Sequence, residues 1–271
     1  MARATRVRAP GRTPGRDHRR VGRRPADVDP AIDRRRGSAL PQGRAVTPSS
    51  SPDDGVLLAI DSATTQVVVA VGGVDGTPLE TAEWPAGYRH GETLLPAIDE
   101  LLGRLDIGRP RLKAIVVGTG PGAFTGLRVG IATAKGLAHA LGLPIIGIST
   151  ADAILAHAPA RSILLLPAGP SDRLVARRGG PATLLLSGTD PELADDETLV
   201  AVDLGGRAPA TAVELGDLAR RGLGAALLVL GAARLAAGDV DDLAGLVPDY
   251  VTLPRGVQAE GGEVAWSHDR R

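Results

Sequence analysis

The alternation of apolar and polar positions becomes regular at Val56. Val56–Asp61 is an apolar run that ends in an acidic residue, and Gln66–Val71 is a second, valine-rich run. Short runs rich in β-branched residues predict strands, and the four residues between them predict a tight turn. Asp75-Gly76 then predicts a hairpin turn into a third strand near Leu79–Trp84. Three consecutive antiparallel strands are therefore expected before any helix.

Helical periodicity follows these strands. Apolar side chains at helical spacing predict one apolar face of a first helix, made of Leu94, Leu95, Ile98, Leu101, Leu102 and Leu105. Gly108 and Pro110 mark the end of this segment, and Ala114–Val117 is a fourth apolar run. A fourth strand is expected there.

The next elements define the fold class. A second helix is predicted from about Thr125 to Leu141, and a fifth strand at Ile145–Ile148. Ser149 or Thr150 can cap a third helix that runs to about His157. The order strand-strand-strand-helix-strand-helix-strand-helix is that of the ribonuclease-H-like, or actin-like (ASKHA), half-domain of α/β proteins. A doubly wound dinucleotide fold would alternate from its first strand.

After about residue 160 the pattern is weaker and rich in Gly and Pro. The strands expected there are Ser162–Pro167, Leu174–Ala176 and Thr183–Leu186, with helices at Ala210–Arg221 and Gly224–Ala237 and a closing strand or tail at Val247–Leu253. The predicted domains are a disordered extension at 1–55, an actin-like lobe at 56–160, a second, shortened α/β lobe at 161–255, and a tail at 256–271.

Charge separates the extension from the rest of the chain. Residues 1–50 carry about thirteen Arg against four Asp, whereas the remaining residues sum to about −9. This extension shows no apolar period, so it cannot offset the entropy of ordering and is expected to be disordered. It can be interpreted as a dispensable extension, as a basic arm for RNA phosphates, or as an organelle transit peptide.

Composition excludes several kinds of site. The chain has no Cys, which excludes disulfides, thiolate chemistry and Cys-ligated zinc. Its five His do not share a metal-binding spacing, and no metal site is expected. Its apolar runs are shorter than the ~20 residues of a membrane span, so no membrane association and a cytoplasmic location are expected.

Two stretches could contact a phosphate. Asp61 and Thr64 stand in the turn after the first strand, and a glycine-rich loop at 118–126 precedes the second helix. Free N–H groups at such a junction can bind an anion. The candidate phosphate or nucleotide residues are Asp61, Thr64, Gly120, Gly122 and Thr125. The alternative is that Asp61 and Thr64 satisfy turn amides and that the glycines serve only tight turning and close packing.

The second helix contains a stripe of small residues every four positions, at Gly126, Gly130, Ala134 and Ala138. Gly inside a helix costs ~1 kcal/mol relative to Ala, so another backbone is expected to lie very close. That backbone belongs either to this chain's own sheet or to a partner helix. The predicted partner interface comprises His90, Leu94, Leu95, Ile98, Leu101, Leu102, Leu127, Gly130, Ile131, Ala134, Leu137 and Ala138.

Several of these segments resemble the TsaB (YeaZ) family. The segments are Leu58–Thr64, His90 before an amphipathic helix, Gly120–Gly130, Pro144–Thr150 and Pro248–Val251. The run Gly-Pro-Gly-Ala-Phe-Thr-Gly-Leu-Arg is the most specific of them. That family is the dimerisation subunit of the bacterial machinery for threonylcarbamoyladenosine in tRNA.

The resemblance implies an actin-like scaffold without catalytic activity. It implies pairing of the first two helices with a TsaD-like catalytic subunit, association with a TsaE-like ATPase, and contact with tRNA through the complex. It also implies a homodimer when TsaD is absent. No tightly bound cofactor is expected, although ATP or ADP could lie at the partner interface. The metal-binding His pair of TsaD is replaced here by Ser149, Thr150, Ala151 and Asp152.

Two alternatives stay open. One is an actin-like small-molecule kinase or metallopeptidase-like enzyme that uses Asp61 and the glycine-rich loop. The other is an RNA-binding module that uses the arginine-rich arm. The second lobe also departs from the family pattern at Pro167–Arg173, which affects any ligand contact expected from that lobe.

Overall fold

The computed structural model describes residues 55–86 and 90–251, which form two sheets. The first sheet has the order β3-β2-β1-β4-β5. Its strands are β1 (Val56–Asp61), β2 (Gln66–Gly73), β3 (Pro78–Pro85), β4 (Leu112–Gly120) and β5 (Ile145–Ser149). β1 pairs antiparallel with β2 and parallel with β4. This confirms the predicted order of elements and the actin-like half-domain, because β4 and β5 join in parallel through helical crossovers.

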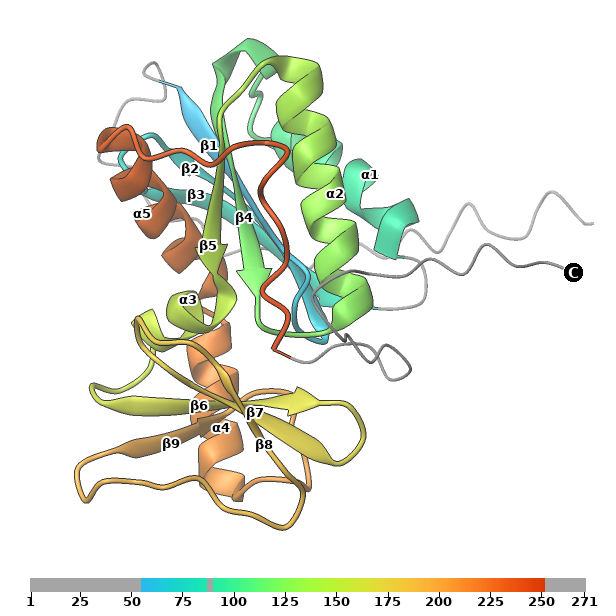
Figure 1. The fold of residues 1–271 in the computed structure, drawn as a ribbon. Helices are drawn as coiled ribbons and strands as arrows, with labels where there is room; N and C mark the ends of the chain where they lie inside the picture. Colours follow the sequence, from blue (N-terminus) through green and yellow to red (C-terminus); the bar gives the residue numbers. More distant parts are fainter. Residues whose placement is uncertain (1–54, 87–89, 252–271) are drawn as a thin grey trace, which may run out of the picture. The chain divides into compact units, whose positions relative to one another are not determined.

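Helices cover both faces of this sheet (Figure 1). α1 (His90–Arg104) and α2 (Phe124–Leu141) pack on one face, and α5 (Leu223–Ala236) packs on the other. A short 3-10 helix, η2 (Arg109–Arg111), links α1 to β4. The strands are buried on both sides, which explains why β1 and β4 are almost continuously apolar rather than alternating.

Local signals set the ends of two helices as expected. Gly142 ends α2 in the left-handed conformation, with φ of 63°. Ser149 caps α3 (Thr150–Ala156) by accepting a hydrogen bond from the backbone N–H of Asp152. Thr150, the alternative cap, uses its hydroxyl elsewhere.

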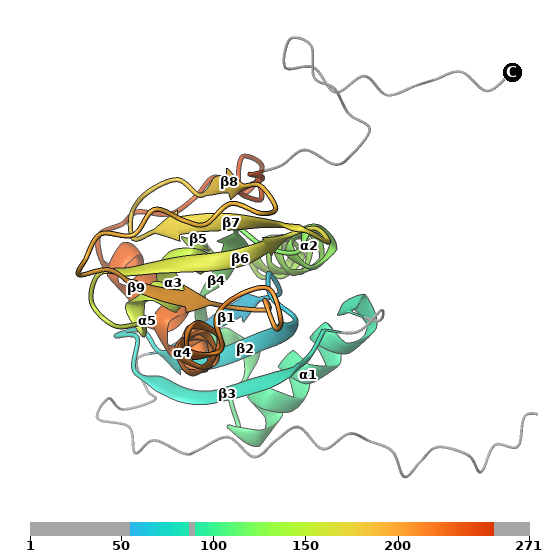
Figure 2. The ribbon, with the colours of Figure 1, turned by 90° about the horizontal axis from the view of Figure 1, so that it is seen from below.

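The second sheet has the order β8-β7-β6-β9. Its strands are β6 (Ser162–Ala168), β7 (Asp172–Arg177), β8 (Thr183–Leu185) and β9 (Thr198–Ala201). α4 (Ala210–Arg220) packs against β9, and Figure 2 shows these elements together. The first three strands and α4 confirm the prediction. β9 was not predicted, because its four residues follow an acidic stretch and are too few to show a period.

The predicted second lobe at 161–255 is too wide. α5 contacts all five strands of the first sheet, and buried side chains such as Leu228 join the core on that face. The residues after α5 also return to this sheet, where Asp241 bridges to Ile145 at the edge of β5. The second lobe proper is therefore the part that carries β6–β9 and α4.

Candidate functional site

Asp61, at the end of β1, lies at the centre of a buried polar junction. It accepts hydrogen bonds from the hydroxyl of Thr150, at 2.6 Å, and from the backbone N–H of Ala63, at 2.8 Å. Its side chain is fully buried, and this burial raises its pKa to about 6, against the lowering effect of the two hydrogen bonds. A Cβ at Gly118 would lie 1.7 Å from its Oδ2, so glycine is required there.

The glycine-rich loop closes over this junction. The N–H of Gly120 donates to the hydroxyl of Thr150 at 3.0 Å, and the N–H of Ala123 donates to the carbonyl of Ala63 at 2.7 Å. A Cβ at Gly122 would lie 2.2 Å from that same carbonyl oxygen. The glycines of this loop therefore let it pack closely against the chain's own β1–β2 turn.

These contacts change the interpretation of the predicted phosphate residues. The structure does bring Asp61, Gly120 and Gly122 together, but Asp61 and Gly120 are buried, and Gly122 is half-buried at the edge of a hollow. Thr64 is buried as well, and its hydroxyl donates to the carbonyl of Gln66 at 2.9 Å. Only Thr125 is exposed, in the first turn of α2. In this conformation the geometry matches the turn-satisfying interpretation, and no carboxylate oxygen of Asp61 faces solvent.

The stripe of small residues on α2 meets the same turn. A Cβ at Gly126 would lie 2.0 Å from the carbonyl oxygen of Ser62, and a Cβ at Gly130 would lie 2.3 Å from the hydroxyl oxygen of the same residue. Ala134 and Ala138 are buried in the core beneath α1 and α2. Of the two alternatives for this stripe, packing within the chain itself therefore holds at Gly126 and Gly130, because the chain's own β1–β2 turn already fills that space.

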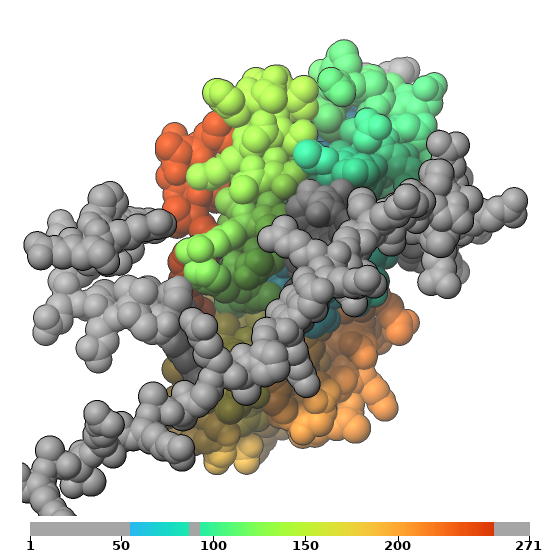
Figure 3. All heavy atoms as spheres, turned by 90° about the vertical axis from the view of Figure 1, so that its right-hand side faces the viewer, coloured from blue at the N-terminus to red at the C-terminus, as the bar shows by residue number. Residues whose placement is uncertain are grey.

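An apolar groove lies between α1 and α2. Figure 3 shows the side of the molecule on which these two helices lie. Its volume is about 350 Å³. The side chains that line it are Leu58, Leu95, Ile98, Asp99, Leu102, Arg109, Leu112, Leu137, Ala140 and Leu141. Leu95 is 51% exposed.

The groove divides the predicted interface residues into two sets. Leu95, Ile98, Leu102 and Leu137 line the groove. Buried away from it are Leu94, Leu101, Leu127, Gly130, Ile131, Ala134 and Ala138. His90 begins α1, and its side chain lies outside the described part of the structure.

A second small-residue face was missed from the sequence. Ala132, Gly136 and Ala140 also recur every four residues along α2, and all three are exposed. A Cβ at Gly136 would meet nothing within 4 Å, and the same is true of exposed Gly103 on α1. Because α2 is small or apolar nearly all round, spacing alone could not decide which stripe faces the sheet.

The segment after α5 covers the other flank of α2. Tyr250 accepts a hydrogen bond from Nε of Arg128 at 2.8 Å, and its ring lies 5.2 Å from that of Phe124. The guanidinium of Arg128 stacks over Phe124, with its carbon 3.8 Å from the ring centroid. A hollow of about 370 Å³ lies beside this cluster, against Pro121 and Leu174.

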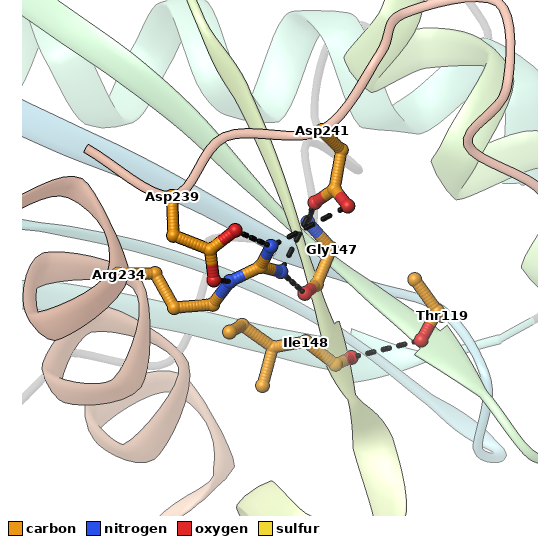
Figure 4. Close-up of polar contacts among 6 residues, drawn as sticks. All are labelled: Thr119, Gly147, Ile148, Arg234, Asp239 and Asp241. Carbon is orange, nitrogen blue, oxygen red and sulfur yellow. Dashed lines mark hydrogen bonds and ion pairs between the residues drawn. The ribbon is translucent and has the colours of Figure 1, made fainter. Parts of the chain in front are cut away.

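The same segment is tied to the edge strand β5 (Figure 4). Nη1 of Arg234 donates to the carbonyl of Gly147 at 2.6 Å, and the N–H of Gly147 donates to Asp241 at 2.7 Å. Asp239 accepts two further hydrogen bonds from Arg234, and these raise the pKa of the guanidinium above its ordinary value. The backbone of β5 is thereby paired on its outer side.

Two further properties concern only the described residues. No helix among them is long and apolar enough to cross a membrane. Within the same ranges, no three His, Asp or Glu side chains gather closely enough to hold a metal ion.

Known proteins match parts of this chain. The family model for tRNA N6-adenosine threonylcarbamoyltransferase, TsaD, matches residues 84–195. The tRNA threonylcarbamoyladenosine biosynthesis protein TsaB of Escherichia coli K12 is 39% identical over 94 residues, which is 35% of this chain and 40% of that protein. TsaB of Haemophilus influenzae is 45% identical over 65 residues, 24% of this chain and 28% of that protein. The matched part thus spans well under half the length of these relatives.

Fold and site together define a two-lobed, actin-like α/β protein whose first lobe carries a helix pair with an open apolar groove. The solved structure of YeaZ from Pseudomonas aeruginosa aligns with a TM-score of 0.59 and 26% identity, over 72% of this chain and 99% of that one. The chain is similar to TsaB (YeaZ) proteins, in agreement with the resemblance of its sequence motifs.

Proposed function

We propose that this chain is the non-catalytic, dimerising subunit of a tRNA threonylcarbamoyladenosine (position 37) synthesis complex. Its α1–α2 face would pair with a TsaD-like catalytic subunit. The apolar groove between these two helices is the observation that carries the proposal. The TsaB relatives are named for tRNA threonylcarbamoyladenosine biosynthesis, which supports a role in that process. The match to the TsaD family model supports a partner with a related fold.

The groove has the features of an unfinished helix-packing surface. Leu95 stands half exposed at its rim, while Ile98 and Leu102 form its wall and are shielded from water. In helix-in-groove recognition, the helix that enters such a groove inserts apolar side chains from one of its faces. A stable subunit contact buries about 1,500 Å² or more, so the groove would be the centre of a larger contact over both helices.

The exposed small-residue face extends this surface. Gly136 and Ala132 leave the backbone of α2 open to close approach, and Gly103 does so on α1. Side-chain-poor helix faces let a second helix pack at short interaxial distance. A partner could therefore place one helix in the groove and another along the outer face of α2, which gives a four-helix contact.

The test is co-purification of the full chain with the TsaD-like subunit of the same cell. We expect Leu95→Glu and Gly136→Leu to reduce the recovered complex at least tenfold. Gly136→Leu should not harm the fold, because its Cβ meets no atom within 4 Å and Leu favours a helix over Gly. Ala236→Leu, an exposed position on α5, is the matched control and should retain the complex.

Recovery of the complex at wild-type yield with both Leu95→Glu and Gly136→Leu would refute the proposed interface. A concentration-dependent homodimer of the isolated chain should be lost in the same two variants. Association with a TsaE-like ATPase, contact with tRNA through the complex, and ATP or ADP at the partner interface remain predictions. Calorimetric titration of nucleotide into the assembled complex and into the isolated chain would test the last of these.

A further inference from the structure

Three cations gather between α1 and the start of β4 without ionic partners. Most of the other arginines that the structure describes are ion-paired, as Arg104 is with Glu80 and Arg220 is with Glu83. Within the described ranges, Arg109, Arg111 and Lys113 form no ion pair at all. Because the chain beyond residue 50 is acidic overall, three unpaired cations within five residues are a distinct positive patch.

Arg111 has an unusual environment. Its Nε and Nη2 atoms are shielded from solvent and have no hydrogen-bond partner. A guanidinium stays charged at any ordinary pH, and a shielded N–H without an acceptor is costly. The positive charge of Arg111 is therefore uncompensated within the described ranges.

The position of the patch relates it to the proposed interface. Arg109 itself lines the α1–α2 groove, beside Leu112. The stem of Lys113 lies along Gly55, where a Cβ would come within 2.5 Å of it. Leu112 lies between Arg111 and Lys113 in the sequence and pairs with Val56 at the start of β1. The three cations therefore lie in the segment that leads from η2 into β4, and Arg109 among them lines the groove.

We infer that the partner seated in the α1–α2 groove presents carboxylates to Arg109, Arg111 and Lys113. The occupant is an amphipathic helix, apolar along the groove and acidic at the end that meets η2. This inference rests on the proposed function and adds the chemistry of the partner surface. Charge complementarity of this kind fixes the direction in which a helix lies in a groove and speeds association.

Another source of carboxylates exists within the chain. Asp53 and Asp54 directly precede Gly55 in the sequence and lie outside the described residues. If they were the partners of Arg111, the cation would stabilise the isolated chain. If the partner subunit supplies the carboxylate, unpaired Arg111 lowers the stability of the isolated chain, and binding removes this penalty. The two sources thus predict opposite effects of Arg111 on thermal stability.

The experiment compares Arg111→Met, Arg109→Glu and the double variant Asp53→Asn/Asp54→Asn in the full chain. We expect Arg111→Met to leave the Tm of the free chain unchanged or higher, since an apolar replacement removes an unpaired shielded charge. We expect Arg111→Met and Arg109→Glu to weaken binding of the TsaD-like subunit about tenfold or more at low salt. The loss should shrink at high salt. Arg221→Met, at an exposed arginine after α4, is the control.

The outcomes separate this inference from the proposed function. If the wild-type chain binds the TsaD-like subunit and both arginine variants bind equally well, only the acidic-helix inference fails. A fall in Tm for both Arg111→Met and the double aspartate variant would show that the cations pair with carboxylates of this chain. That result would overturn the inference. Failure of the wild-type chain to bind would remove the proposed interface and, with it, this inference.

Discussion

The hydroxyl of Ser62 donates a 2.7 Å hydrogen bond to the carbonyl oxygen of Gly126, and this contact sets the position of α2 on the sheet. Gly130 lies one turn further along, where a Cβ would come within 2.3 Å of the same hydroxyl oxygen. The β1–β2 turn is thus inserted against the glycine face of α2. The opposite face of the helix is left open for the proposed partner.

Alanine substitutions at two glycines of α2 should have opposite effects. Gly136→Ala gains helix propensity without a clash and should raise the free energy of unfolding by up to about 1 kcal/mol. Gly130→Ala gains the same propensity but overlaps the Ser62 hydroxyl, and should destabilise by about 1–3 kcal/mol. Urea denaturation of both variants measures the difference.

The proposed clash between a Cβ at position 130 and the Ser62 hydroxyl can be checked in a Ser62→Ala background. There the oxygen that the new Cβ would meet is gone, so Gly130→Ala should cost less than in the wild-type chain. Equal costs in both backgrounds would show that the Ser62 hydroxyl is not what excludes a side chain at position 130.

Much of the fold was predictable because its signals are local. The valine-rich β2, the face of α1 through Leu101, and Gly142 after α2 each indicate their element within a few residues. β9 and the return of α5 to the first sheet were not predictable. β9 is only four residues long, and an apolar helix such as α5 carries no information about which sheet it covers.

The site was harder to predict because it depends on contacts between distant residues. Asp61 and Thr150 are 89 positions apart, and nothing near either residue signals the hydrogen bond between them. The two small-residue stripes of α2 have the same spacing, so only the structure shows that Gly130 faces the sheet and Gly136 faces outward. Leu95 and Ile98 were correctly placed together because helical spacing alone puts them on one side of α1.

The buried carboxyl of Asp61 should make stability depend on pH. Its pKa is raised from 3.8 to about 6, chiefly by burial. The folded chain therefore binds more protons than the unfolded chain between these values, and the free energy of unfolding should fall as pH rises from 4 to 6. The contribution is on the order of 2–3 kcal/mol and should be absent in Asp61→Asn.

Urea denaturation at pH 4 to 8 tests this, with the Asp61→Asn profile subtracted from that of the wild type. Thr150→Val removes the hydroxyl donor, so it should raise the pKa of Asp61 further and extend the fall above pH 6. Asp217→Asn, at an exposed carboxyl on α4, should follow the wild-type profile. A flat difference profile would contradict the assignment to Asp61.

Asp203 should hold the second lobe against the β1–β2 turn. Its carboxylate accepts hydrogen bonds from the backbone N–H of Thr65, at 2.7 Å, and from the Thr65 hydroxyl, at 2.5 Å. Its φ of 59° lies in the left-handed region, which costs a non-glycine residue free energy. Asp203→Ala loses both acceptors and keeps the strain, so we expect a loss of about 2–3 kcal/mol.

Two further substitutions separate the hydrogen bonds from the strain. Asp203→Asn tolerates the left-handed conformation and keeps one acceptor, so it should cost about 1 kcal/mol. Asp203→Gly removes the strain and both acceptors, and should fall between Asn and Ala. Equal stability of all three variants, measured by urea denaturation, would show that the carboxylate does not hold the lobes together.

Arg234 should hold the segment after α5 on the edge of β5 through the geometry of its guanidinium. It bonds Asp239 through Nε and Nη2 and bonds the carbonyl of Gly147 through Nη1, contacts that a planar fork of five donors can make together. Arg234→Lys keeps the charge but cannot make them all. We expect the Gly147 amide and the Asp241 amide, which bonds the Ile145 carbonyl at 3.0 Å, to exchange hydrogen about tenfold faster in this variant. Arg221→Lys, the same change at an exposed site, should exchange like the wild type, and unchanged protection in Arg234→Lys would show that charge alone closes the edge.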